Sequence, residues 1–261
     1  MIKQTDTRYR KDFYYYANDL YIGKSLELYG EYQQSEIDLL LKLINSNCIV
    51  YDVGANIGYH TNAFATVAKK VIAFEPNPKN FSLFAKNVEG LSNVYGIQAA
   101  VGEKSGVLKC SDFDPSKEGN FGNVLVREEG DIEVPVLSLD EYQDLPWPDL
   151  IKIDVEGMEY QVMMGMKNII TQRTPALYYE AHETKELPEI YDFLSSLEYN
   201  LYWTCVPNYV KTNFKNNSNN IFEDTILVSI LAWPKNHGAI PLPIVLDRYD
   251  NHTKLLARNK K

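Results

Sequence analysis

Residues 48–100 alternate between short apolar segments rich in β-branched residues and amphipathic segments with helical spacing. The apolar segments, at residues 48–53, 71–74 and 94–100, have the length and composition of buried strands. In the second amphipathic segment, Asn77 is an expected N-cap and Pro78 suits the first helical position. A β-α-β-α-β order of this length predicts a parallel sheet with right-handed crossovers, an α/β fold of the nucleotide-binding type.

The second half of the chain resumes this alternation after an interruption. Residues 102–148 contain short β-like pieces between Gly, Asp and Pro turns, which predicts a small antiparallel insertion. Beyond it we expect helices at residues 157–172 and 187–197, and strands at residues 150–154, 176–179, 201–204 and 225–230. Because no helix separates the last two strands, they are expected to pair antiparallel.

The two ends of the chain differ from this pattern. The Tyr-rich start is expected to cover the core, followed by a helix from Ser35 to about Asn45 with Asp38 placed for a capping-box contact. The end is rich in proline. We therefore expect an N-terminal helical cap segment at 1–45, a main domain at 46–232 that contains the insertion, and a C-terminal tail at 233–261.

Composition narrows the class of partner. The 261 residues carry a formal net charge of −9, with no dense basic stretch before the last residues, which weighs against binding a nucleic acid backbone. Cys48, Cys110 and Cys205 are few and far apart, so neither a disulfide framework nor a zinc site is supported. No window is apolar enough for an export signal or a membrane span. A cytoplasmic protein is expected.

Polar residues gather where the first two predicted strands end. In a doubly wound sheet the ligand lies at the carboxyl ends of the strands. Strand 48–53 leads into Gly54, Asn56 and Gly58, which allow a tight turn and close approach to a ligand. Glu75 ends the next strand, 23 residues after Asp52, where a carboxylate can accept both hydroxyls of a ribose. A dinucleotide fold prefers a different glycine spacing, so the turn alone leaves a Rossmann dehydrogenase open.

Five segments, taken in order, carry a resemblance to a known family. They are DVGANIGYHT, AFEPNP, LSLDEY, LIKIDVEGMEYQVMMGM and PALYYEAHE, with YIGKSLELYGEY as a lead-in. Together they resemble the FkbM family of S-adenosylmethionine-dependent methyltransferases, which act mainly on hydroxyl oxygens. The resemblance implies a class I methyltransferase fold: a Rossmann-like doubly wound sheet of seven strands, the last antiparallel.

The resemblance also implies the cofactor site. The glycine turn would hold the methionine part of S-adenosylmethionine, and the acid after the second strand would hold its ribose. By motif position these roles fall to Asp52, Gly54, Asn56, Gly58 and Glu75. Asn77 joins this predicted cofactor-binding set, and so does Ala100, which matches the adenine-packing segment but lacks the acid that many methyltransferases place there.

The predicted catalytic residues end the fourth and fifth strands. Period-two alternation puts Lys152, Asp154 and Glu156 on one side, and Glu180 and His182 likewise. An alcohol needs help in losing its proton, so we expect His182 to act as general base, oriented by Glu180 or Glu156. Two alternatives stay open: Lys152 pairing structurally with Asp154, and the acids with His182 binding Mg²⁺ or Mn²⁺. His60 is expected to pack locally.

The predicted function is methyl transfer to a hydroxyl of a small molecule or a sugar. The acceptor pocket is expected to come from the insertion and the N-terminal segment. The alternatives are an NAD(P)-dependent Rossmann oxidoreductase and a non-catalytic module that binds S-adenosylmethionine. The strand-end acids and histidine argue against the module, and the antiparallel finish argues against the oxidoreductase.

Overall fold

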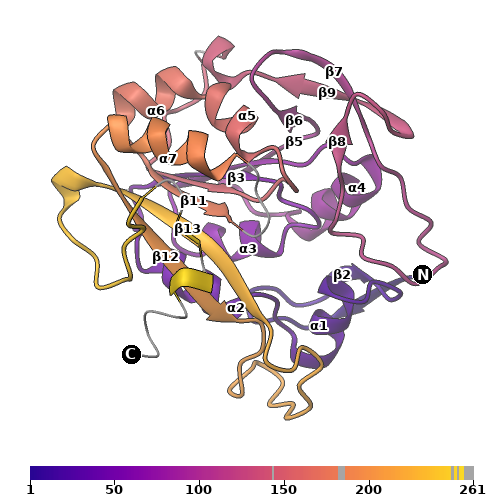
Figure 1. Ribbon diagram of the computed structural model, residues 1–261. Helices are drawn as coiled ribbons and strands as arrows, with labels where there is room; N and C mark the ends of the chain where they lie inside the picture. Colours follow the sequence, from indigo (N-terminus) through magenta and orange to yellow (C-terminus); the bar gives the residue numbers. More distant parts are fainter. Residues whose placement is uncertain (143, 182–185, 248–249, 252, 256–261) are drawn as a thin grey trace.

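The structure is a computed structural model that describes residues 1–142, 144–181, 186–247, 250–251 and 253–255. Its main sheet has seven strands within these residues, in the order β12-β13-β11-β10-β3-β4-β5 (Figure 1). The strands are β3 (Ile49–Val53), β4 (Lys70–Phe74), β5 (Val94–Ile97), β10 (Leu150–Ile153), β11 (Ala176–Glu180), β12 (Tyr199–Pro207) and β13 (Ile226–Pro234). From β11 to β5 every neighbouring pair is parallel, whereas β13 runs antiparallel to both β11 and β12. The predicted doubly wound sheet with an antiparallel last strand is confirmed.

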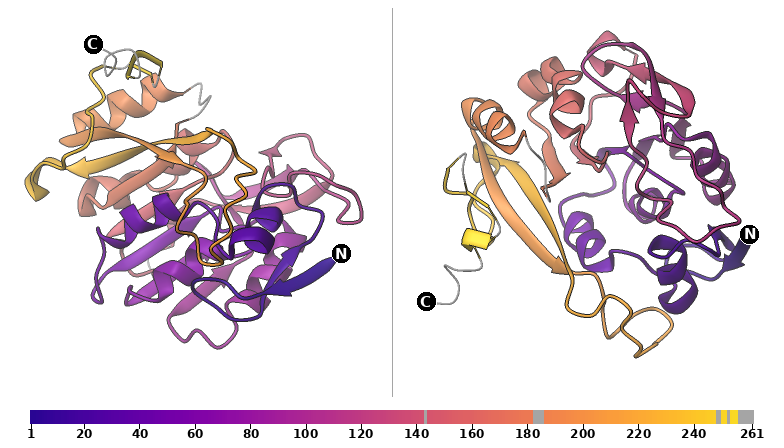
Figure 2. Two further views of the ribbon diagram at one scale, coloured as in Figure 1. Left: turned by 90° about the horizontal axis from the view of Figure 1, so that it is seen from below. Right: turned by 45° about the vertical axis from the view of Figure 1, so that its right-hand side comes forward.

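Helices cover both faces of this sheet (Figures 1 and 2). On one face lie α5 (Glu159–Met164), α6 (Lys167–Arg173) and α7 (Leu187–Ser196); the other carries α2 (Gln34–Leu41), α3 (Tyr59–Ala65) and α4 (Pro78–Asn87). Strand residues alternate between the two cores: Tyr51 packs with α5–α7, and its neighbour Val50 with α2 and α3. Because both faces are covered, the central strands are almost wholly apolar.

Two predicted elements differ from the structure in where they end. The strand expected at 94–100 stops at Ile97, since the backbone turns there and Ala99 donates its N–H to Ile97 O at 3.0 Å. The helix expected at 157–172 is broken at Gly165, whose carbonyl accepts from Asp140 N at 2.9 Å. Asp140 then caps α6 by accepting from Asn168 N at 2.8 Å. Two short helices replace the single long one.

The insertion folds as a second sheet in the order β6-β9-β7-β8. It comprises β6 (Ala100–Val101), β7 (Gly106–Cys110), β8 (Val126–Arg127) and β9 (Ile132–Leu137), followed by the 3₁₀ helix η1 (Leu139–Glu141). Its pairs are antiparallel except β6 with β9, which is parallel. Within residues 102–148 the pairs β7 with β8 and β7 with β9 are antiparallel, as expected of the insertion; the parallel pair is made by β6, where the end of the expected strand 94–100 crosses into this sheet.

The N-terminal segment is more ordered than expected. A hairpin of β1 (Ile2–Thr5) and β2 (Phe13–Tyr16) precedes α1 (Ile22–Tyr29), and α2 ends at Leu41 rather than near Asn45. The expected capping box is absent from α2: its N-cap makes no side-chain bond, and Asp38 accepts from the Gln34 side chain at 2.8 Å. Tyr15, Tyr16 and Tyr29 are buried, in line with the covering role expected of the tyrosines, whereas Tyr21 is 48% exposed.

The connection between β12 and β13 reaches back to this segment and lies beside α1 (Figures 1 and 2). Lys215 in the connection donates to Leu26 O at 3.1 Å and to Glu27 O at 2.9 Å. After β13 comes the 3₁₀ helix η2 (Lys235–His237). Among the described residues, none of the helices combines the length and apolarity needed to cross a membrane.

Candidate active site

A cavity of about 290 Å³ opens at the carboxyl ends of β3, β4, β10 and β11. Most of the residues that line it come from three regions of the chain. The strand ends contribute Gly54, Asn56, Glu75, Lys152, Asp154, Glu156 and Glu180; the N-terminal segment contributes Tyr21, Ile22, Tyr32 and Gln33; the insertion and its entry contribute Ala99, Ala100, Val101, Asn120, Gly122, Asn123 and Val124. The cavity therefore lies at the strand ends, where the sequence predicts the cofactor site.

The glycine turn forms the floor of the cavity through left-handed backbone. Gly54 has φ +81°, and a Cβ added there would lie 1.8 Å from Asp154 O. Asn56 and Gly58 follow at φ 52° and 88°, so the chain turns sharply into α3. Gly58 sits behind the turn at the N-cap of α3 and is not among the residues that line the cavity. Only a residue without Cβ allows β3 and β10 to approach this closely.

Glu75 is held rigidly at the end of β4. Its Oε2 accepts from Asn56 N and its Oε1 from Asn77 N, each at 2.9 Å. Burial raises the pKa of Glu75 to about 7, although these two backbone N–H groups favour the ionised form. Asn77 does not line the cavity: it caps α4 by accepting from Lys79 N at 2.9 Å, and it acts on the site only through Glu75. Each carboxylate oxygen keeps a second lone pair that can accept from a ligand hydroxyl.

Asp52 and Lys152 form a buried ion pair beneath the cavity. They face each other in the register of β3 and β10, and Lys152 Nζ lies 3.3 Å from Asp52 Oδ1. Thr61 Oγ1 donates to Asp52 Oδ2 at 2.6 Å. Lys152 also donates to Gly54 O at 3.0 Å and lies 3.2 Å from Asp154 Oδ2. These contacts favour the structural interpretation of Lys152: it holds the glycine turn onto the strand ends.

The charge state of Lys152 follows from the same contacts. Burial alone would lower the pKa of this amine, but Asp154 and Asp52 outweigh it and the pKa is raised. A permanently protonated amine cannot accept a proton from an alcohol. Lys152 is thus an electrostatic group rather than a base.

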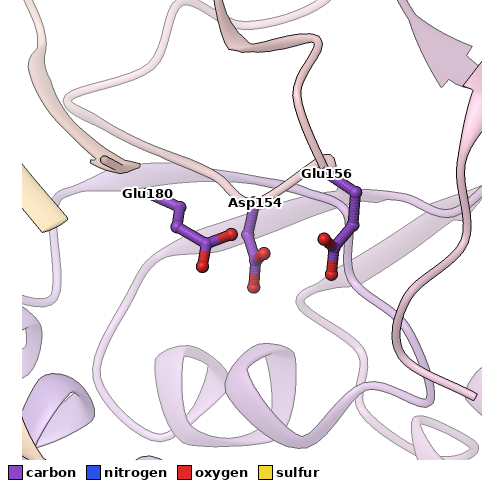
Figure 3. A group of neighbouring side chains, drawn as sticks. All are labelled: Asp154, Glu156 and Glu180. Atoms are coloured by element: carbon purple, nitrogen blue, oxygen red, sulfur yellow. The ribbon is translucent and has the colours of Figure 1, made fainter. Parts of the chain in front are cut away.

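Three carboxylates lie close together on one wall of the cavity, at the ends of β10 and β11 (Figure 3). One oxygen from each of Asp154, Glu156 and Glu180 lies within 4.8 Å of the others. Burial, followed by repulsion from Asp154, raises the pKa of Glu156 to about 7 and that of Glu180 to about 9. Glu156 has the left-handed φ of 56°, a conformation that costs free energy for a residue with a Cβ. Like charges are brought together here at a cost in stability, which is typical of a functional site.

The two histidines of interest differ. His182 lies outside the described residues. His60 is 6% exposed, and its Nε2 lies 3.1 Å from Oε1 of Glu36 on α2; Glu36 also accepts from Tyr178 OH at 3.0 Å. The expected local packing of His60 is thus a polar contact between α3 and α2, and the ring borders the cavity.

Sequence reasoning missed the individual residues of the N-terminal wall. Tyr32 and Gln33 lie in the connection between α1 and α2, and Gln33 has a left-handed φ of 50°. Tyr32 is the last residue of the lead-in segment YIGKSLELYGEY, whereas Gln33 lies outside every segment that resembles the family; their place at the cavity depends on how the N-terminal segment folds. Residues of this segment and of the insertion both line the cavity.

The strand order, the glycine turn after β3 and the acid after β4 define a class I methyltransferase fold. Within that class the chain belongs to the FkbM methyltransferase family: residues 52–201 match the family model described as the methyltransferase FkbM domain. The solved FkbM methyltransferase from Methylobacillus flagellatus KT superposes with a TM-score of 0.50 at 16% identity, covering 72% of this chain and 44% of that chain. At that identity the likeness concerns the fold alone.

Two curated relatives carry more specific names. The hexuronic acid methyltransferase AglP of Haloferax volcanii is 34% identical over 157 residues, which cover 57% of this chain and 62% of AglP. The 2-O-methyltransferase NoeI of Sinorhizobium fredii is 28% identical over 180 residues, covering 58% of this chain and 72% of NoeI. The chain thus spans about three fifths of the length of AglP.

Proposed function

We propose that this chain transfers the methyl group of S-adenosylmethionine to a hydroxyl of a sugar. Membership of the FkbM family supports methyl transfer. The names of AglP and NoeI favour a carbohydrate hydroxyl over other small-molecule acceptors. The observation that carries the proposal is the cavity itself. Glu75, a carboxylate placed to bind a ribose, and the three acids Asp154, Glu156 and Glu180 line the same cavity.

The cavity lining fits an adenosyl cofactor. Glu75 can accept from the ribose hydroxyls, while Gly54 and Asn56 border the methionine part. Ala100, between Ala99 and Val101, supplies an apolar wall for the adenine. Asp52, Gly58 and Asn77 act indirectly, by holding the turn and Glu75 in place. An NAD(P)-dependent oxidoreductase is disfavoured by the family match and by the antiparallel β13.

The protein's part in the reaction is to position the methyl donor beside the acceptor hydroxyl and to accept the hydroxyl proton. S-adenosylmethionine supplies a methyl on a sulfonium sulfur, so the C–S bond breaks as the acceptor oxygen forms the new C–O bond and a neutral thioether leaves. The hydroxyl proton passes to His182, two residues beyond Glu180, as general base. Glu156 and Glu180 stabilise the imidazolium that results. The same acids are the residues that would hold Mg²⁺ or Mn²⁺.

Radiolabelled S-adenosylmethionine and a panel of neutral, amino and uronic sugars test the proposal. We expect label in at least one sugar, and a rate about 10² to 10⁴ lower for His182→Ala with unchanged affinity for S-adenosylhomocysteine. A His237→Ala variant is the matched control, because His237 lies in η2 away from the cavity. Tighter binding of NAD than of S-adenosylhomocysteine would reject the methyltransferase. Cofactor binding with no transfer to any acceptor class would favour a non-catalytic module, and a full rate in His182→Ala would remove the base.

A further inference from the structure

His60 is a buried cavity residue that the proposed reaction does not use. It lies in the first turn of α3, is 6% exposed and lines the cavity. Its Nε2 lies 3.1 Å from Oε1 of Glu36, a buried acid of α2. The other ring nitrogen, Nδ1, makes no hydrogen bond within the described residues and is not enclosed by them. This nitrogen is available to a ligand in the cavity.

Glu36 is held from its other side by a chain of buried hydrogen bonds. Its Oε2 accepts from Tyr178 OH at 3.0 Å, and Tyr178 OH accepts from Thr204 Oγ1 at 3.1 Å. All three side chains are buried. The chain thus runs from β12 through β11 to α2 and ends at His60. Because Glu36 is an acceptor in this chain, it is placed to accept from Nε2–H as well, which fixes the orientation of the ring.

The backbone of the glycine turn has no spare donor for a ligand. The five N–H groups of residues 54–58 all donate within the protein. Their acceptors are Phe74 O for Gly54 N at 3.0 Å and Ala55 N at 2.9 Å, Glu75 Oε2 for Asn56 N at 2.9 Å, the Asn56 side chain for Ile57 N at 2.7 Å, and Ala55 O for Gly58 N at 2.9 Å. An anionic group of a ligand beside this turn therefore needs a donor from a side chain.

Charged donors are scarce in the cavity. Among the described residues that line it, Lys152 is the one lysine, and arginine is absent. Lys152 Nζ already donates to Gly54 O at 3.0 Å and lies 3.3 Å from Asp52 and 3.2 Å from Asp154. A protonated imidazole carries an N–H on each nitrogen, so His60 can donate to Glu36 through Nε2 and to a ligand carboxylate through Nδ1.

The strand order places His60 near the methionine end of the cofactor. Ala100 follows β5, Glu75 ends β4 and the glycine turn follows β3, so an adenosyl group bound at Ala100 and Glu75 directs its methionine part across β3 toward β10. His60 lies just after that turn, and Glu36 borders a smaller pocket at the ends of β10 and β11. The imidazole is thus on the side of the turn away from Ala100.

We propose that His60, held by Glu36, binds the α-carboxylate of the methionine part of S-adenosylmethionine through Nδ1–H. His60 is then a cofactor-binding residue, and Glu36 is a positioning residue that acts through it. The identity of the ligand rests on the proposed function. The α-ammonium group has other partners, because Asp154 and Glu156 line the same cavity.

Titration calorimetry with S-adenosylhomocysteine and its decarboxylated analogue, which keeps the amine, tests this contact. His60→Gln puts an amide nitrogen near the position of Nε2, so the bond to Glu36 can remain while the donor at Nδ1 is lost. We expect S-adenosylhomocysteine to bind at least tenfold more weakly to this variant, because a hydrogen bond to a charged group is lost. The analogue should bind the variant and the parent equally well.

Two further variants separate binding from folding. His60→Asn puts its amide near the position of Nδ1 and should recover part of the affinity for S-adenosylhomocysteine. Glu36→Gln keeps the size of the side chain but removes the counter-charge of the imidazole, so it should weaken S-adenosylhomocysteine more than the analogue. His237→Gln makes the same substitution in η2, away from the cavity, and should bind both ligands as the parent does. Thermal melting confirms that each variant is folded.

The two ligands also distinguish the ways in which the proposal can fail. Equal weakening of both ligands in His60→Gln would show a structural role or a contact with the amine, and unchanged binding of both would show no contact. Either result overturns the proposal while leaving methyl transfer intact. A selective loss of S-adenosylhomocysteine binding, in a chain that methylates no sugar, would support the contact and reject sugar methylation alone. A parent chain that binds neither ligand would reject both.

Discussion

Carboxylates of the same type differ here according to what surrounds them. Asp52 is buried but faces a lysine and a threonine hydroxyl. Glu75 is buried against two backbone N–H groups, and its pKa rises to about 7. Glu156 and Glu180 are buried near other acids; the pKa of Glu156 also rises to about 7, and that of Glu180 rises further, to about 9. Because desolvation and like charge both penalise the ionised form, position rather than residue type sets the charge.

Glu75→Gln tests the ribose contact. A carboxylate that accepts from a ribose hydroxyl contributes about 1.5 to 3 kcal/mol per bond, so we expect S-adenosylhomocysteine to bind about 10 to 100 times more weakly. The introduced amide NH₂ would also face the N–H of Asn56 or Asn77, which the carboxylate now accepts. Isothermal calorimetry measures the change, with the exposed Glu103→Gln as control. Equal affinity in parent and variant would contradict the assignment.

The affinity for S-adenosylhomocysteine should also depend on pH, because Glu75 changes its charge near neutral pH. A folded-state pKa of about 7 means that Glu75 is mostly protonated at pH 6 and mostly ionised at pH 8. The ionised form accepts more strongly, so affinity should rise by up to about tenfold across this range and stay flat in Glu75→Gln. Without ligand, the contribution of Glu75 to the free energy of unfolding changes with pH in the opposite direction. Because the pKa is raised on folding, the stabilising contribution is complete below about pH 4.5 and is lost as pH rises through about 7.

At the scale of elements, β3 and β10 are joined by more than their backbone ladder. Asp52 and Lys152 are opposite each other at the centre of the sheet, and both side chains are almost fully buried. An acid and a base are tolerated in two apolar strands only as a pair, because either one alone would be an uncompensated buried charge. The pair also ties Gly54 to the end of β10 through its carbonyl.

Lys152→Met should therefore destabilise the protein by about 3 to 5 kcal/mol, since it leaves Asp52 buried without a counter-charge. The double variant Asp52→Asn/Lys152→Met should recover a large part of that loss, because the replacements are neutral and similar in volume. Urea unfolding of the parent, both single variants and the double variant measures the coupling. Simple additivity of the two single effects would show that the two side chains do not act as a pair.

At the scale of the whole molecule, the cavity is closed by segments far apart in sequence. The connection between β12 and β13 packs on α1, where Tyr29 OH donates to Asn219 O at 2.7 Å and accepts from Ile221 N at 2.9 Å. Arg8 and Glu31 add an ion pair at 2.7 Å within the N-terminal segment. These contacts hold Tyr32 and Gln33 over the acids at the ends of β10 and β11. The part of the cavity lined by Tyr32 and Gln33 thus depends on the docking of the N-terminal segment.

Tyr29→Phe removes one hydroxyl from this contact and leaves the Ile221 N–H without its acceptor. We expect a local loss of about 1 to 2 kcal/mol, seen as faster amide hydrogen exchange in residues 213–222 and in α1. Affinity for S-adenosylhomocysteine should not change, because Glu75 and the glycine turn are untouched. Tyr142→Phe, at an exposed tyrosine, is the control. Exchange rates equal to those of the parent would show that the connection is held by other contacts.

The sequence by itself determined the main sheet and the strand ends that border the cavity. Apolar strands separated by helical spacing predict the parallel order, and two closing strands without a helix between them predict the antiparallel finish. The glycine turn and Glu75 follow, because strand ends meet at one edge of a parallel sheet. These features depend on local backbone preferences and on the period of the apolar residues, which a single sequence records directly.

Only the tertiary structure decided the remaining features. It ends the expected strand 94–100 at Ile97. It breaks the expected helix 157–172 at Gly165, whose carbonyl accepts a hydrogen bond from Asp140 N. It also places Gln33 in the lining of the same cavity as the acids. The first two differences involve contacts distant along the chain: Ala100 and Val101 pair with β9, and Asp140 N donates to Gly165 O. The free energy of such a contact depends on which segments meet, and no local pattern in either segment records it.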